Sequence, residues 1–214
     1  MNIQAAIAQV VAGQSLSRAD METVMRTVMQ GEATEAQIGG LLVALSMKGE
    51  TIDEIVGAAS VMRSLATPVD IDTDGLIDLA GTGGDGANLF NVSTAASFVV
   101  AGAGGRIAKH GNRSVSSSSG SSDVLSALGV DLSVSPAAIA DSIASIGVGF
   151  MFAPMHHSAM KHAIGPRQQL AMRTIFNVLG PLTNPAGARR QVLGVFSPAL
   201  CDVMASALRD LGSE

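Results

Sequence analysis

The strongest constraint on the fold is an alternation of short apolar runs with helical segments, which begins after Thr67-Pro68. Strands that are joined by helices pair in parallel, and the ligands of such sheets bind at the carboxyl ends of the strands. The pattern therefore predicts an α/β domain over residues 68–214 with a mainly parallel sheet. Its expected strands cover residues 76–80, 106–108, 148–152 and 192–196, and its expected helices cover 93–103, 122–128, a segment from Pro136 and a region from Met155.

Residues 1–67 predict a small domain made only of helices. Apolar residues recur there at intervals of three and four, from Met21 to Met62. The segments 17–20 and 51–54 have the form of capping boxes, in which a hydroxyl and a carboxylate satisfy free amides at a helix start. The methionines suit a core better than a cofactor site, since methionine fills irregular gaps. The same apolar faces also suit contact with a partner subunit.

Composition narrows the classes of protein. The chain has 214 residues, 47% of them hydrophobic, which is enough to bury a sizeable core. A net charge of -5 argues against nucleic acid or an anionic membrane as the main partner. The N-terminus lacks the pattern of a secretory signal, and no apolar run is long enough to span a membrane. A single cysteine, Cys201, excludes an internal disulfide and lies in an apolar helical pattern typical of a core residue. We expect a cytoplasmic protein.

The last segment of the chain predicts an amphipathic helix, with apolar residues spaced from Leu200 to Leu211. In an α/β domain such a helix leads to another strand, but the sequence stops at Glu214. We therefore expect the sequence to be part of a longer protein.

A glycine-rich turn follows the first predicted strand, with the sequence Gly-Thr-Gly-Gly-Asp over residues 81–85. It matches neither the dinucleotide-binding glycine pattern nor the Walker pattern. Gly81, Gly83 and Gly84 would let the backbone wrap a diphosphate, and the next helix start favours an anion. Asn91, Ser93 and Thr94 add donors and acceptors there, and Ser93 offers an oxygen to magnesium. The alternative is a tight turn that ends in a helix cap.

A basic segment follows the second predicted strand, from Lys109 to Arg113. Lys109 suits a phosphate group and Asn112 is a planar donor and acceptor for an organic substrate. A solvated basic turn is the alternative. The serine run 116–122 precedes a helix, so it suits a second anion site or a linker.

Two further features carry possible ligand chemistry. His156, His157 and His162 lack the spacing of a metal site. Arg167 follows Gly165-Pro166 at the start of a helical segment, where a guanidinium suits bidentate binding of a carboxylate. A surface ion pair is the alternative for Arg167.

Taken together, the motifs at 81–85, 91–94, 109–113 and 173–185 resemble the anthranilate phosphoribosyltransferase family, in the same order and along the whole chain. The resemblance implies a helical domain over 1–67, an α/β domain of the nucleoside phosphorylase and phosphoribosyltransferase type over 68–214, and a homodimer formed through the N-terminal helices. It also implies transfer of a phosphoribosyl group from phosphoribosyl pyrophosphate to the amine of anthranilate, with Mg²⁺ as cofactor. No side chain is implied as an acid or base, and Lys109 and Asn112 act by electrostatic positioning.

The resemblance also implies the site residues. Anthranilate would contact Gly81, Asn112 and Arg167, and Ser93 would bind magnesium, with the remaining acidic ligands expected beyond residue 214. Phosphoribosyl pyrophosphate would contact Gly81, Gly84, Asp85, Leu89, Asn91, Val92, Ser93, Thr94, Lys109, His110, Gly111, Asn112, Arg113, Ser114, Val115, Ser116, Ser117 and Ser121.

Two positions depart from the pattern of the family. Leu89 stands where many members carry a threonine that touches the diphosphate, and Ser118 replaces a basic residue common in the serine loop. Without the acidic magnesium pair, we expect this chain alone to bind phosphoribosyl pyrophosphate weakly and to turn over little. A pyrimidine nucleoside phosphorylase is an alternative, although Asn88-Leu89 stands where that family has a Lys-Ser pattern. A nucleic-acid-binding relative of the same fold is a further alternative, but it would need a strongly basic surface.

Overall fold

A computed structural model describes residues 1–83, 90–113 and 119–214 of the chain. The chain divides into two compact units, which are described separately. The helical unit contains residues Met1–Ala66, His157–Thr183 and Asp202–Leu211. The sheet unit contains residues Thr67–His156, Asn184–Cys201 and Gly212–Glu214.

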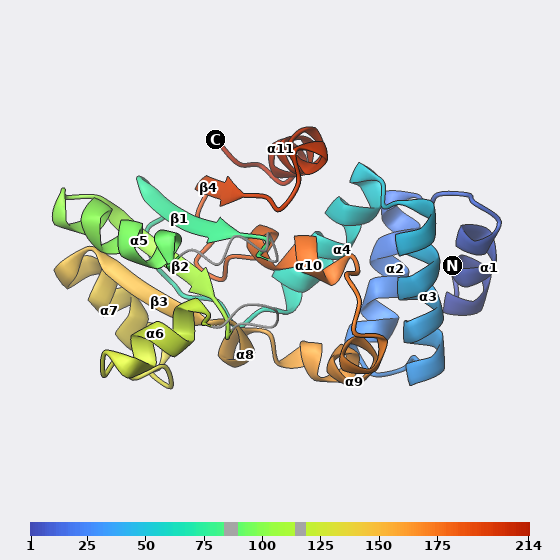
Figure 1. The fold of residues 1–214 in the computed structure, drawn as a ribbon, viewed down its shortest axis with the longest axis horizontal. Coiled ribbons are helices and arrows are strands. Elements are labelled where there is room, and N and C mark those ends of the chain that lie inside the picture. Colours follow the sequence, from blue (N-terminus) through green and yellow to red (C-terminus); the bar gives the residue numbers. More distant parts are fainter. Residues whose placement is uncertain (84–89, 114–118) are drawn as a thin grey trace. The chain divides into compact units, whose positions relative to one another are not determined.

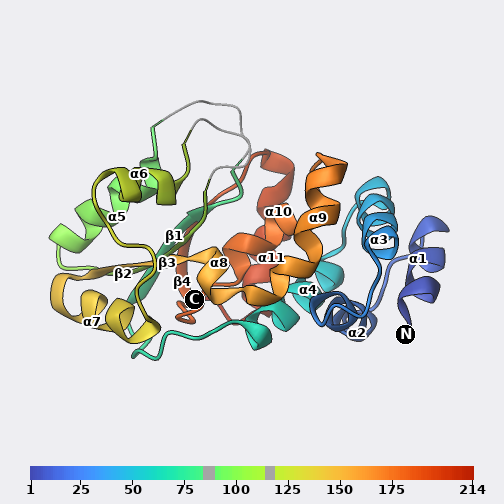
Figure 2. The same ribbon diagram turned by 90° about the horizontal axis from the view of Figure 1, so that it is seen from below.

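The helices of the helical unit pack against one another in pairs. Helix α2 packs on α4, α1 packs on α3, and α9 packs on α3 and α2 (Figure 2). Its elements are α1 (Ile3–Val11), α2 (Arg18–Met29), α3 (Glu35–Lys48), α4 (Ile52–Leu65), η1 (Ser158–Met160), α9 (Lys161–Leu170), α10 (Phe176–Leu179), η2 (Gly180–Leu182) and α11 (Cys201–Asp210).

The apolar spacing of the N-terminal segment gives these helices buried faces. Met21 and Met25 are buried in α2 and Met62 is buried in α4, so the methionines pack the core as predicted. Helix α11 is amphipathic as expected, with Met204 buried. Cys201 at its first residue is exposed, so the expectation of a core cysteine is wrong.

Capping explains where these helices begin. At α4 the predicted capping box is confirmed, because the Thr51 hydroxyl accepts from Glu54 N–H while Glu54 accepts from Thr51 N–H. At α2 only half of the box is present. The Ser17 hydroxyl accepts from Asp20 N–H, but the Asp20 carboxylate accepts from that same hydroxyl at 2.6 Å. A further capping box, which the sequence analysis missed, starts α3 after Thr34.

Glu54 also forms a buried ion pair. Its side chain has no exposed surface, and Oε2 accepts from Lys48 Nζ at 2.9 Å. Oε1 accepts from the backbone N–H of Leu16 at 2.9 Å. The carboxylate thereby joins the loop before α2 to the connection between α3 and α4.

The sheet unit contains four parallel strands in the order β3-β2-β1-β4 (Figure 1). This confirms the predicted α/β class with a parallel sheet. The β1–β2 register pairs Leu76 with Arg106 and Ile77 with Ile107, and the β1–β4 register runs from Ile77–Arg190 to Gly81–Gly194. The strands are β1 (Leu76–Gly81), β2 (Arg106–Gly111), β3 (Val148–Phe152) and β4 (Arg190–Gly194).

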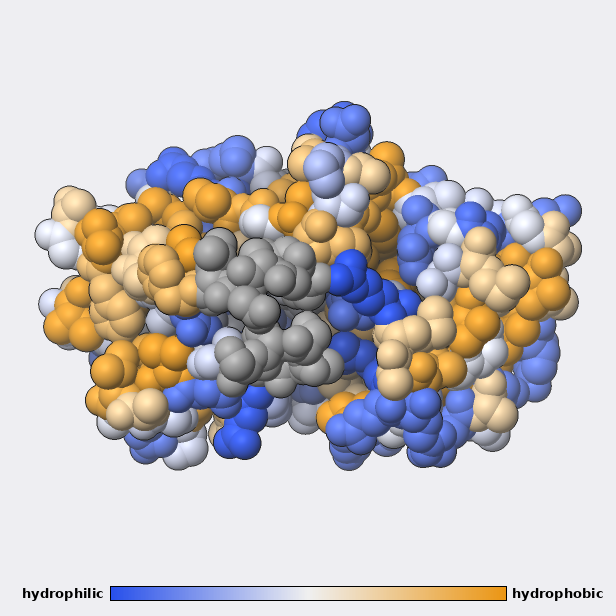
Figure 3. Space-filling model, viewed as in Figure 1, coloured by the Kyte–Doolittle hydropathy of each residue, from blue (hydrophilic) through white to orange (hydrophobic). Residues whose placement is uncertain are grey.

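Helices cover this sheet, with α5 beside β1 and β2, and α7 beside β3 (Figure 1). The core between sheet and helices includes Leu76, Ile143 and Met151. Apolar surface extends over α5 in Figure 3, where Phe98 and Val99 are exposed. The helices of the unit are α5 (Val92–Gly102), α6 (Ser121–Ala127), α7 (Pro136–Ile146), α8 (Ala153–His156) and η3 (Pro198–Leu200).

Strand β4 is an edge strand and begins two residues before the predicted apolar run. Val192 at its centre is 65% exposed, which is why the strand carries less apolar burial than its partner β1. In the described part of the chain, no helix has the length and apolar character needed to cross a membrane.

Candidate functional site

The glycine turn begins where β1 ends, and its first residues are held against β4. Thr82 N–H donates to the Gly194 carbonyl at 2.9 Å, and the Thr82 hydroxyl accepts from Phe196 N–H at 3.0 Å. A Cβ at Gly81 would lie 3.3 Å from the same Gly194 carbonyl. Gly83 has a φ of +65°, a left-handed conformation that favours glycine. Gly81 and Gly83 thus leave the backbone of this turn free of side chains at these two positions, at the carboxyl end of β1.

The first turn of α5 lies after this glycine turn. Asn91 precedes the helix but its side chain makes no cap, and its amide instead donates to the Ser119 carbonyl at 3.1 Å. Ser93 and Thr94 stand in the first turn, where backbone amides lack intrahelical partners. The Thr94 hydroxyl is buried and has no hydrogen-bond partner among the described residues. This helix start therefore offers uncapped donors to an anion.

Lys109 extends from β2 to this helix start. Lys109 is buried, and only 3% of the residue's surface is exposed. Lys109 Nζ donates to the Leu79 carbonyl at 2.5 Å and to Ser93 Oγ at 3.1 Å. Burial lowers the pKa of the ammonium, while the nearby charge of Asp78 opposes that shift. Two of the three donors of the ammonium are used by the described residues, so one stays available for a ligand.

Asp78 is a site-adjacent residue that the sequence analysis missed. It has no exposed surface, and burial raises the pKa of its carboxyl from 3.8 to about 6. Its Oδ1 accepts from His110 N–H at 3.2 Å and its Oδ2 accepts from Gln191 Nε2 at 3.1 Å. A hydrogen bond from Asn184 and the charge of Lys109 partly offset the effect of burial on the pKa.

After Lys109 the structure describes Gly111, the last residue of β2, and then Asn112 and Arg113. A Cβ at Gly111 would lie 2.8 Å from the Phe150 ring and 3.3 Å from Ser121 Cβ, so only glycine fits there without displacement of a neighbour. Asn112 is exposed, and its Oδ1 accepts from Arg113 N–H at 2.8 Å. The Arg113 guanidinium lies 6.0 Å from the centre of the Phe152 ring.

Arg167 lies in α9 of the helical unit. It is half-buried, and its guanidinium lies 5.1 Å from the centre of the Phe176 ring. Burial lowers the pKa of this guanidinium. Within residues 1–83, 90–113 and 119–214 no carboxylate pairs with Arg167, so the surface ion pair considered above is not formed there.

The other predicted ligand residues divide into two groups. Ser121 opens α6, and His110 and Val92 lie in β2 and α5. Outside the described residues lie Gly84, Asp85, Leu89, Ser114, Val115, Ser116, Ser117 and Ser118.

Among the described residues, Ser93 offers an oxygen that could bind a magnesium ion. Ser93 Oγ accepts one hydrogen bond from Lys109 and keeps a second lone pair. Among the residues that the structure describes, no group of three or more His, Cys, Asp or Glu side chains could hold a metal. Ser93 therefore fits as one oxygen ligand of a magnesium ion, and the other ligands would have to come from elsewhere.

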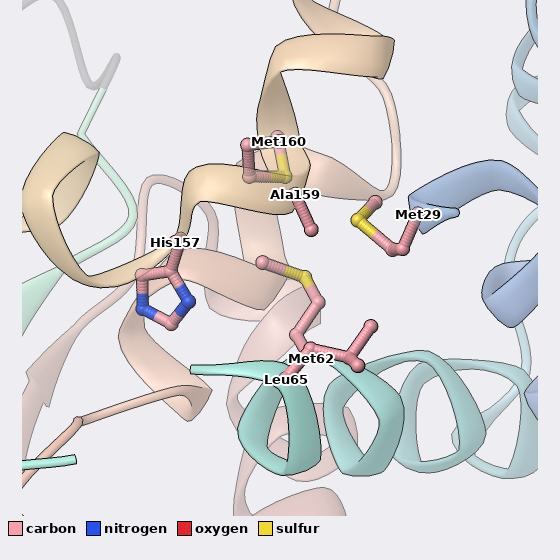
Figure 4. Close-up of a pocket in the computed structure, with 6 residues that line it drawn as sticks. All are labelled: Met29, Met62, Leu65, His157, Ala159 and Met160. Atoms are coloured by element: carbon pink, nitrogen blue, oxygen red, sulfur yellow. The ribbon is translucent and has the colours of Figure 1, made fainter. Parts of the chain in front are cut away.

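The helical unit contains a small apolar hollow, which does not suit a phosphorylated ligand. Figure 4 shows its lining, in which the His157 ring is the only polar side chain among Met29, Met62, Leu65, His157, Ala159 and Met160. The neighbouring His156 is buried in the sheet unit, where its Nδ1 lies 2.8 Å from the Thr67 carbonyl.

The chain combines a helical unit with a parallel-sheet unit, and the helix start of α5 and the buried Lys109 lie in the sheet unit. Two family models match the chain: the glycosyl transferase family helical bundle domain over residues 4–66, and the glycosyl transferase family a/b domain over residues 73–214. The chain belongs to this glycosyl transferase family.

Similar proteins specify the family further. The anthranilate phosphoribosyltransferase of Teredinibacter turnerae is 68% identical over 214 residues, which cover 100% of this chain and 63% of that protein. The enzyme of the same name from Cellvibrio japonicus is 66% identical, with 62% of that protein covered. The resemblance inferred from the motifs is confirmed. The chain spans about 62% of the length of the curated relatives it matches.

Solved structures agree with these relatives. Anthranilate phosphoribosyltransferase from Thermus thermophilus matches with a TM-score of 0.93 and 48% identity over 97% of this chain and 63% of that chain. The enzyme from Saccharomyces cerevisiae in complex with PRPP and Mg matches with a TM-score of 0.89 and 29% identity, over 98% of this chain and 62% of that chain.

Proposed function

We propose that this chain carries the phosphoribosyl pyrophosphate site of an enzyme that transfers the phosphoribosyl group to the amine of anthranilate. The observation that supports this most strongly is the buried Lys109 ammonium at the first turn of α5, beside the glycine turn. The relatives named anthranilate phosphoribosyltransferase supply the identity of the substrates.

In this reaction the bond between the anomeric carbon of the ribose and the diphosphate oxygen breaks. The amine nitrogen of anthranilate forms a bond to that carbon and then releases a proton, and pyrophosphate leaves. Negative charge grows on the leaving diphosphate as the bond breaks, so fixed positive groups beside it lower the barrier. We expect Lys109 and the uncapped amides of α5 to supply these positive groups, since they lie next to each other. No side-chain acid is needed, because the diphosphate leaves as a stable anion.

The described residues proposed for phosphoribosyl pyrophosphate lie at the end of β1, in and just after the second half of β2, and at the starts of α5 and α6. We assign the diphosphate to Lys109, Ser93 and Thr94, and we assign the anthranilate carboxylate to Arg167. Gly81 and Asn112 would contact the anthranilate amine side. Magnesium, when bound, screens the diphosphate charge, and Ser93 supplies one oxygen to it. The full set proposed for phosphoribosyl pyrophosphate is the one that the sequence analysis names.

We further propose that the helical domain over residues 1–67 joins two copies into a homodimer, that residues 68–214 form the substrate domain, and that the protein acts in the cytoplasm. The exposed apolar side chains of Val11 and Met47 support the first point, and the position of Lys109 in the second half of β2, beside the first turn of α5, supports the second. Sedimentation analysis of the chain tests the dimer, since a concentration-independent monomer would contradict it.

The binding proposal is tested with Lys109→Gln. We expect isothermal titration of phosphoribosyl pyrophosphate with Mg²⁺ to show an affinity at least about tenfold lower than that of the unchanged chain, because a buried charge-assisted contact is lost. Lys161→Gln is the matched control, since Lys161 is exposed in the other unit. Equal affinities for all three proteins would overturn the proposed site.

A further inference from the structure

The carboxylate of Asp78 lies at the centre of the sheet, between two neighbouring strands. On the β2 side it accepts from the backbone N–H of His110, and on the β4 side it accepts from the Gln191 amide. The β1–β2 register ends at Ile77–Ile107, and the next link from β1 to β2 is this side-chain bond. Asp78 therefore fixes how far the end of β2 stands from β1.

Consecutive residues of β1 hold consecutive residues of β2. Asp78 binds the amide of His110, and the carbonyl of Leu79 accepts from the Lys109 ammonium. The position of the Lys109 side chain thus depends on the same strand spacing that Asp78 fixes. Asp78 also has the charge that opposes the effect of burial on Lys109, although no direct ion pair joins them.

Burial of an ionised carboxylate at this position costs free energy. Burial raises the pKa of Asp78 to about 6, which means that the ionised form is disfavoured there. Asparagine has nearly the same shape and would accept a hydrogen bond from one of these amides without the desolvated charge. Unlike asparagine, the carboxylate accepts from both amides, and it keeps a negative charge near Lys109.

We propose that Asp78 is a positioning residue: its negative charge and its bond to the His110 amide hold the Lys109 ammonium at Ser93, ready for the diphosphate. This inference rests on the proposed function, since it needs an anion at Lys109. It assigns to Asp78 a role in ligand affinity that is separate from its contribution to folding.

The test compares Asp78→Asn with the unchanged chain at pH 8, where Asp78 is ionised. We expect the affinity for phosphoribosyl pyrophosphate with Mg²⁺ to fall about five- to twentyfold by calorimetry, since charge-assisted contacts are about twice as strong as neutral ones. The melting temperature of each protein is measured alongside, because asparagine accepts from fewer of these amides than the carboxylate does. A fall in melting temperature with unchanged affinity would assign Asp78 to folding alone and overturn the inference.

Two further variants separate charge from hydrogen bonding. Gln191→Leu removes one hydrogen bond but keeps the Asp78 charge, so we expect its affinity to stay within about twofold of the unchanged chain. The double variant Asp78→Asn, Gln191→Glu moves the carboxylate to the neighbouring side chain of β4, which contacts residue 78, and is expected to recover part of the affinity. The double variant also tests the inference if the single variant Asp78→Asn does not fold. A folded double variant that binds no better than Lys109→Gln would overturn the inference.

The outcomes also distinguish this inference from the proposed function. If Lys109→Gln weakens binding and Asp78→Asn does not, the positioning role fails while the proposed site stands. If neither substitution changes the affinity, the diphosphate does not bind at Lys109 and both proposals fail.

Discussion

Glu54 in the helical unit and Asp78 in the sheet unit are both carboxylates without exposed surface, but they have different neighbours. Glu54 contacts a cation directly, at 2.9 Å from Lys48 Nζ. Asp78 contacts only amides, and the cation near it, Lys109, bonds instead to a carbonyl and a hydroxyl. A direct ion pair uses up the charge of both partners. The arrangement around Asp78 leaves the charge of Lys109 available to an anion, which is the difference between a structural and a binding use of a buried carboxylate.

Glu54→Gln is expected to have the largest effect on stability. It leaves the Lys48 ammonium buried without its carboxylate, and breaking a buried pair costs about 3–5 kcal/mol. Urea denaturation measures this loss. Asp53→Asn is the control, because its pair with Arg18 is exposed and is worth about 0–1 kcal/mol. A loss below that of the control would mean that Glu54 is not the structural member of the comparison.

Asp78 is expected to make the stability of the chain depend on pH in the direction opposite to an ordinary surface aspartate. Its folded pKa of about 6 lies above the ordinary 3.8, so the folded state binds the proton more tightly. The free energy of unfolding should therefore fall as the pH rises from about 4 through about 6, by about 3 kcal/mol in total at about 1.4 kcal/mol per pKa unit. Asp78→Asn should lack this step. Identical pH profiles for the two proteins would contradict the buried titration.

Phe176→Leu is expected to have the smallest effect on ligand affinity. It tests whether the Arg167 guanidinium of the helical unit is also available to an anion. The Phe176 ring lies against the Arg167 guanidinium, and such a contact is worth about 0.5–1 kcal/mol. We expect the affinity for anthranilate, followed by its fluorescence, to fall about two- to fivefold. Phe98→Leu on the exposed face of α5 is the control. An unchanged affinity in Phe176→Leu would restrict the available cations to the sheet unit.

Much of the fold follows from local patterns. Short apolar runs between helical segments predicted all four strands, because a strand in a sheet covered on both faces requires apolar side chains on both sides. Capping residues located helix starts at Ser17 and Thr51. The edge position of β4 could not be predicted, since exposure of Val192 depends on which strands lie beside it.

The site was predicted less completely, and Asp78 shows why. Its strand segment counted as an apolar run, and the partners that define its role lie 32 and 113 residues away along the chain. Lys109 and Ser93 were found because each stands next to a recognisable apolar run or helix start, although β2 extends to Gly111 and so contains Lys109 rather than ending at residue 108. A residue whose importance comes only from distant neighbours gives no local signal. The prediction that Cys201 lies in the core was wrong, because a helical pattern does not show whether the first residue of the helix is buried.

Gly111 has a consequence for tolerance to substitution. The Phe150 ring and Ser121 occupy the space that a side chain there would need. In a scan of all single substitutions, we expect every larger residue at this position to require a shift of the Phe150 ring, whether or not a ligand is present. A position inside a binding motif can thus be fixed by the room that its neighbours leave, and its intolerance measures packing between β2, β3 and α6.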